Sequence, residues 1–226
     1  MKPNQQQKQQ LQEYLRKGLK YRETYEEVYD HILVALENKA ETSSFNGTVN
    51  EIIREDFGGS KNLWRIEENF RKSVAKDMSS QFWKFFSTYM KFPLAVYTVI
   101  ISAIVYYIIY NINIQPVAFE RIFVLFAFLP ALLVPVRYYK IGYIFKDTKK
   151  SVRDNIFVWI AQFPMRLCIC SNLLLLIYHK ADFSFLGSFE PLVLTIIIVA
   201  EITLSLAVIK LSSAEFKIIK SITHQQ

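Results

Sequence analysis

Arg166, Glu201 and Gln162 are polar side chains inside the apolar carboxyl-terminal part of the chain, where buried charge could do chemistry. Arg166 and Glu201 each lie ten residues into an apolar stretch of nearly bilayer length. At ~1.5 Å per residue, both would lie ~15 Å deep in a hydrocarbon core ~30 Å thick. Because consecutive spans run in opposite directions, we expect the two charges to meet near the midplane.

Two functions fit this polar pair. An unpaired arginine at the bilayer centre costs about 2.5 to 3.5 kcal/mol, so Arg166 should face a partner, and Gln162 lies one turn earlier on the same helix face. The pair either fixes the packing of two spans or forms a site for moving a proton, an ion or a small solute. Transporters usually carry more ionisable groups, broken helices or repeated halves, so the sequence favours the structural pair.

Four apolar stretches have the length of membrane spans, and together they cover residues 92–112, 117–136, 156–177 and 191–211. The formal net charge is +7, and the segment between the second and third stretches is rich in lysine and arginine. Basic residues near membrane ends mark the cytoplasmic side. We therefore expect a multi-pass protein of the cell inner membrane with both termini cytoplasmic.

The predicted fold class is all-α, with an amino-terminal cytoplasmic helical domain followed by a four-helix transmembrane bundle. The expected division is a helical domain over residues 1–80, an interfacial linker helix over 81–91, a membrane domain over 92–211 and a cytoplasmic tail over 212–226. Apolar residues at helical spacing support two helices in the first domain, one ending near Gly18 and one over residues 24–38.

Local signals place two further helices in this domain. Thr48 and Glu51 have the spacing of a capping box, which predicts that a third helix opens at Thr48. Gly58 and Gly59 should close it. Ser60 can then cap a fourth helix, which leads toward the first apolar stretch.

The amino-terminal motifs resemble a known family. The segments Tyr14–Leu19, Glu26–Ile32 and Asn50–Gly58 are similar, in sequence and order, to the HAAS-type helical domain of bacterial membrane proteins. That resemblance implies a small cytoplasmic signalling or regulatory module on a multi-pass membrane protein, associated with PadR-like repressors.

Motifs typical of enzymes are missing: the sequence contains no phosphate-binding glycine-rich loop, no Gly-x-Ser-x-Gly and no His-Glu-x-x-His. Cys168 and Cys170 are two residues apart in a helix and point to different faces. We expect neither an enzyme nor a cofactor or metal site. The expected partners are the lipid bilayer and a cytoplasmic regulatory protein or a membrane protein, without nucleic acid. A small transporter, or transporter subunit, that uses the region of Arg166 and Glu201 is the alternative.

Overall fold

The computed structural model describes residues 2–39, 44–111, 124, 127–141, 143, 149–180 and 190–223. Across these ranges the regular structure is helical, without a strand, which confirms the predicted all-α class. The chain divides into two compact units. Unit 1 comprises residues 1–77 and 143–156, and unit 2 comprises residues 78–142 and 157–226.

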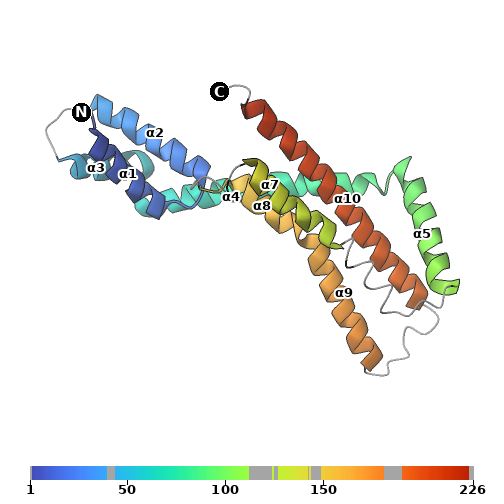
Figure 1. Cartoon of the computed structure of the whole chain (residues 1–226). Helices are drawn as coiled ribbons and strands as arrows, with labels where there is room; N and C mark the ends of the chain where they lie inside the picture. The colour runs from blue at the N-terminus through green and yellow to red at the C-terminus, as the bar shows by residue number, and fades with distance from the viewer. Residues whose placement is uncertain are drawn as a thin grey trace. The chain divides into compact units, whose positions relative to one another are not determined.

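Unit 1 is built from α1 (Gln5–Gly18), α2 (Arg22–Asn38), α3 (Phe45–Phe57) and the first part of α4 (Ser60–Thr88) (Figure 1). The apolar stripes predicted for the first two helices form its core: Leu11 and Leu15 of α1 pack with Val28, Ile32 and Leu36 of α2. Full burial of such a side chain contributes about 1.5–3 kcal/mol, so these stripes hold the helices together.

The start of α3 corrects one prediction. The helix begins at Phe45, one turn before the expected Thr48, because Ser44 caps it by accepting a hydrogen bond from the amide of Gly47 at 3.3 Å. Thr48 lies inside the helix, and its hydroxyl donates to the carbonyl of Ser44 at 3.2 Å. The predicted end is confirmed: Gly58 has a left-handed φ of 71° and terminates the helix.

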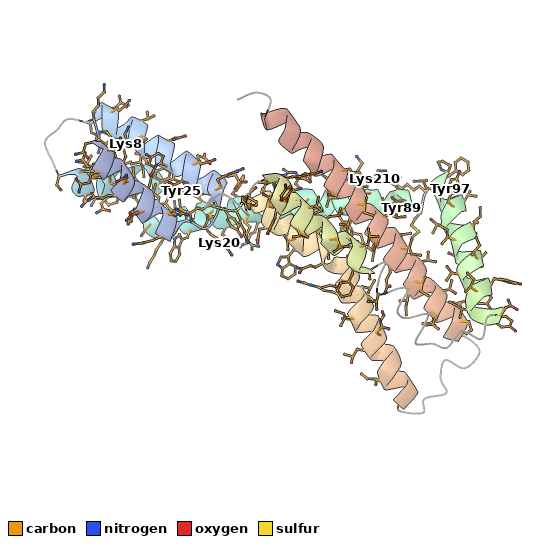
Figure 2. The ribbon with its side chains drawn as sticks, viewed as in Figure 1. Lys8, Lys20, Tyr25, Tyr89, Tyr97 and Lys210 are labelled. Atoms are coloured by element: carbon orange, nitrogen blue, oxygen red, sulfur yellow. The ribbon has the colours of Figure 1, made fainter. Side chains whose placement is uncertain are left out.

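Unit 2 contains the second part of α4, which continues unbroken to Thr88, and the helices α5 (Leu94–Asn111), η1 (Leu129–Leu132), α7 (Leu133–Ile141), α8 (Val152–Ala161, from Phe157 on), α9 (Phe163–Lys180) and α10 (Glu190–Thr223). α10 packs against both α5 and α9. Tyr89 and Tyr97 line a small cavity between α5 and α10 (Figure 2).

Among the described residues, three stretches are long and apolar enough to cross a membrane: Leu94–Asn111, Val152–Leu174 and Pro191–Glu215. They match the first, third and fourth predicted spans. In the second predicted span, 117–136, residues 117–123, 125 and 126 lie outside the described residues, and its described end forms η1 and the start of α7.

The third of the predicted spans is divided at Gln162, where α8 ends and α9 begins. Pro164, in the first turn of α9, has no amide hydrogen to donate to an earlier carbonyl. The amide of Arg166 still donates to the carbonyl of Gln162 at 3.0 Å. The proline therefore interrupts the helix, and the chain resumes helical bonding directly after it.

Candidate coupling site

The turn between α1 and α2 exposes backbone groups that need partners. Leu19 and Tyr21 have extended backbones, so the helical ladder stops there. The carboxylate of Glu67, on α4, accepts hydrogen bonds from the amides of Lys20 and Tyr21, both at 2.9 Å. Glu67 is buried, and these two amides compensate the loss of its hydration.

Lys149 provides the hydrogen-bond donor for the free backbone carbonyls of this turn. Its ammonium donates to the carbonyl of Arg16 at 2.7 Å and also to the carbonyl of Leu19. These carbonyls are at the carboxyl end of α1, where free acceptors and the helix dipole favour a cation. Partial burial lowers the pKa of Lys149 from its usual value.

Glu23, in the first turn of α2, binds the beginning of α8. Its carboxylate accepts a hydrogen bond from the hydroxyl of Ser151 and another from the amide of Val152 at 3.1 Å. The amide of Arg153 donates to the hydroxyl oxygen of Ser151 at 3.2 Å. Ser151 and Glu23 together therefore cap α8, whose first amides have no partner within the helix.

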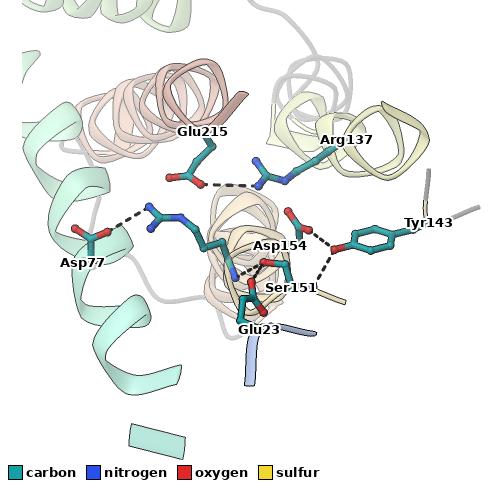
Figure 3. Close-up of polar contacts among 8 residues, drawn as sticks. Glu23, Asp77, Arg137, Tyr143, Ser151, Asp154 and Glu215 are labelled. Carbon is teal, nitrogen blue, oxygen red and sulfur yellow. Dashed lines mark hydrogen bonds and ion pairs between the residues drawn. The ribbon is translucent and has the colours of Figure 1, made fainter. Parts of the chain in front are cut away.

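Tyr143 completes the network from the other side of Ser151. Its phenol donates to the carboxylate of Asp154 at 2.6 Å and accepts from the amide of Ser151 at 2.9 Å (Figure 3). Burial, then the bond to Asp154, raises the pKa of Tyr143 well above its usual value of 10.0. The phenol is therefore held in its protonated, donating form.

Three further contacts bind residues 149–155 to the helical module, two of them to the α1–α2 turn and one to α4. The backbone amide of Arg22 donates to the carbonyl of Lys150 at 3.2 Å, and the side-chain amide of Asn155 donates to the phenol of Tyr21 at 3.2 Å. Arg153 pairs with Asp77 of α4 at 3.2 Å. We call the set formed by residues 16–23, Glu67, Asp77, Tyr143 and 149–155 the coupling site. In this site, charged side chains form hydrogen bonds with the free backbone amides and carbonyls at the ends of helices.

The sequence-predicted polar residues belong to unit 2, whereas the coupling site belongs to unit 1. Arg166 donates to Gln162 at 3.0 Å, as their spacing predicts, and its guanidinium lies 4.2 Å from the ring centroid of Trp159. Glu201 is 3% exposed and accepts a hydrogen bond from Ser171 at 3.3 Å.

The expected ion pair between Arg166 and Glu201 is not formed: within the part of the chain that the structure describes, no ion pair joins these two side chains. The physical reason is their register. Glu201 faces Ser171, five residues beyond Arg166, which is an axial offset of ~7.5 Å.

The buried ion pair of unit 2 is instead formed by Arg137 of α7 and Glu215 of α10, at 3.8 Å (Figure 3). Each side chain is 1% exposed, and the Arg137 guanidinium lies 4.8 Å from the ring centroid of Phe157. Both residues lie outside the predicted spans: Arg137 directly follows the second, and Glu215 is in the predicted cytoplasmic tail. One signal was available: Glu201, Val208 and Glu215 are seven residues apart, so Glu215 continues the buried face of α10.

The described residues thus define an all-helical protein that carries three candidate membrane-spanning helices. No family model, no curated protein and no solved structure matches the chain. The HAAS-type resemblance therefore stays a prediction from the motifs. No group of three or more histidine, cysteine or acidic side chains among the described residues is arranged to hold a metal ion.

Proposed function

We propose that this chain is a multi-pass membrane protein of signalling or regulatory function, in which unit 1 is a cytoplasmic module that binds another protein. One observation carries the proposal: residues 149–155, which lead into the candidate span Val152–Leu174, are hydrogen-bonded into the helical module at the coupling site. A module that only tethered the chain would need no such contacts.

The coupling site gives the signal a physical route. Glu23 caps the first turn of α8, and α8 is the beginning of a candidate span. A partner that moves α1 against α2 would change the position of Glu23. The hydroxyl of Ser151 and the amide of Val152 would then lose or regain their partner, so binding at the module would be coupled to the start of the span.

An exposed apolar patch on α4 is a suitable surface for the partner. Ile66 and Phe70 are four residues apart on α4, and 40% and 41% of their surfaces are exposed. Trp64, on a neighbouring face of the same helix, donates its indole N–H to the carbonyl of Gly18 at 2.8 Å. A partner on α4 would therefore lie next to the α1–α2 turn of the coupling site.

The proposed location is the cell inner membrane, with four spans and both termini cytoplasmic. The three candidate spans and the basic residues around the coupling site support this topology, because lysine and arginine near span ends mark the cytoplasmic side. The fourth span of the proposal is the predicted stretch 117–136.

Photo-crosslinking of the full chain in membranes tests the proposal. Benzoylphenylalanine at position 70 should capture a specific protein, whereas the same probe at position 76, exposed on another face of α4, should not. Full-length protein is required, because an amino-terminal fragment would lack Lys149 and Ser151. The proposal fails if position 70 yields no specific adduct, or if positions 70 and 76 yield the same ones.

A small transporter, or transporter subunit, is the second candidate function. The observation that favours it is the burial of Glu201 in α10 against the Ser171 hydroxyl of α9. A carboxyl group at such a position can bind and release a proton. Glu201→Gln should then abolish solute or proton flux in vesicles while the variant inserts normally, and unchanged flux would exclude a transport role for Glu201.

A further inference from the structure

Arg166 lies on the exposed stripe of α8 and α9 rather than on their packed face. Positions four and three residues apart share one side of a helix, and most residues of the stripe that includes Arg166 and Gln162 are exposed. Its exposed members are Trp159, Phe163, Cys170, Leu173 and Ile177. Once the chain is in a membrane, a stripe of this kind faces lipid.

The guanidinium of Arg166 is directed toward the amino-terminal end of α9. It contacts Gln162 and Trp159, four and seven residues earlier in the sequence, as expected for a long side chain that leans back along its helix. The contact with Gln162 uses one terminal nitrogen of a group that has five N–H donors. No carboxylate among the described residues pairs with it.

Aromatic contacts indicate the depth of this guanidinium. Phe163 lies at the start of α9, and its ring centroid is 6.3 Å from that of Phe82 and 6.4 Å from that of Trp83, both near the end of α4. At the same end of α4, Lys210 lies 5.3 Å from the ring centroid of Phe85 (Figure 2).

Tryptophan, other aromatic rings and lysine gather at the membrane–water interface. Arg166 is only ~4.5 Å further along α9 than Phe163. Its guanidinium leans back past Phe163 and therefore lies beside these interface-type residues. Headgroup level at the start of α9 would leave the part of Val152–Leu174 from Phe163 on to cross the hydrocarbon core. This depth differs from the midplane position predicted from the sequence.

We propose that Arg166, Gln162 and Trp159 bind the phosphate of an anionic phospholipid in the leaflet next to the end of α4. A guanidinium binds phosphate oxygens through two parallel N–H bonds, and Gln162 and the Trp159 ring fix its plane. The exposed rings of Trp83 and Phe163 contact the upper acyl chain. This site rests on the membrane insertion contained in the proposed function.

Native mass spectrometry of the full chain, purified from phosphatidylcholine vesicles containing phosphatidylglycerol, tests the site. Wild-type protein should retain phosphatidylglycerol in preference to phosphatidylcholine. Arg166→Gln should lower that retention about tenfold, equal to a loss of ~1.4 kcal/mol. The matched control is Lys84→Gln, which removes the same charge from an exposed position near Trp83 and should leave retention unchanged.

Arg166→Lys keeps the charge and decides the question if Arg166→Gln does not fold. A lysine ammonium is a point charge that cannot form the bidentate contact, so retention should fall several-fold. Unchanged retention in Arg166→Lys, or equal losses in Arg166→Gln and Lys84→Gln, would overturn the proposal. Excess inorganic phosphate should not displace the lipid, and displacement would show a site for free phosphate instead.

Extraction of membranes at alkaline pH separates this site from the proposed function. Wild-type protein that resists extraction but shows no preference for phosphatidylglycerol contradicts the lipid site alone. Wild-type protein that is extracted contradicts membrane insertion, and with it both proposals.

Discussion

The carboxylate of Glu23 accepts a hydrogen bond from the amide of Val152 at 3.1 Å, across 129 positions of sequence. This bond joins the first turn of α2 to the first turn of α8. Two of the apolar stretches lie between these residues in the sequence. Unit 1 therefore needs a segment that is synthesised after them, and the module is complete only when residues 149–155 have returned to it.

Tyr143→Phe tests the polar network around Ser151. The change leaves the buried carboxylate of Asp154 without the phenol donor, so we expect a loss of about 1–3 kcal/mol in the free energy of unfolding. Thermal unfolding of the full chain in detergent measures it. Tyr14→Phe, which changes an exposed tyrosine of α1, is the matched control and should unfold like the wild type.

The same tyrosine predicts a dependence on alkaline pH. The pKa of Tyr143 is raised in the folded state, so its contribution is complete below 10.0, the usual value, and is lost as the pH rises above it. Stability should therefore decline less steeply above pH 10.0 in Tyr143→Phe than in the wild type. Parallel declines in the two proteins would contradict this account of the phenol.

Arg137 and Glu215 should show the behaviour of a buried ion pair. Removal of one partner leaves the other charge buried, so Arg137→Leu and Glu215→Leu should each cost about 3–5 kcal/mol, whereas the double variant should recover most of the loss. Melting temperatures in detergent compare them. Arg153→Leu breaks the more exposed pair with Asp77 and should cost no more than about 1 kcal/mol. A double variant as unstable as the sum of both single variants would rule out the pairing.

Gly58→Ala tests the end of α3. Gly58 has a φ of 71°, and a Cβ there would lie 3.2 Å from the Asn62 amide nitrogen, so alanine should cost about 1–2 kcal/mol. Gly18→Ala is the control: Gly18 lies within α1, and a Cβ added there meets no atom within 4 Å. Equal stability of the two variants, measured by thermal unfolding, would show that the left-handed conformation is not required.

Local features of the fold were predictable because they depend on neighbours in sequence. Helical spacing predicted the helix over residues 24–38, whose Val28, Ile32 and Leu36 lie in the core, and Gly58 marked the end of α3. Even local signals compete, however. Ser44 and Thr48 both have side chains that can cap a helix, and only the packed structure shows that Ser44 does so, with Phe45 buried behind it.

The candidate coupling site was not predictable in the same way, because its contacts are distant in sequence. In the sequence, Glu23 has the pattern of an ordinary acidic residue in the first turn of a helix. Lys149 belongs to a basic segment that indicates membrane topology and predicts no specific contact. The same holds for Arg137 and Glu215. The sequence predicts a buried ion pair. Because Arg166 and Glu201 each lie ten residues into an apolar stretch, they were the residues predicted to form it, instead of Arg137 and Glu215.

A double-mutant cycle between Glu23 and Ser151 tests the central claim most directly. Glu23→Gln, Ser151→Ala and the double variant are compared with wild type in the free energy of unfolding of the full chain in detergent. If the coupling site holds residues 149–155 in the module, the two changes will be non-additive by about 0.5–3 kcal/mol. The parallel cycle with Glu26, an exposed residue of the same helix, should be additive. Additive effects for Glu23 and Ser151 would contradict the account.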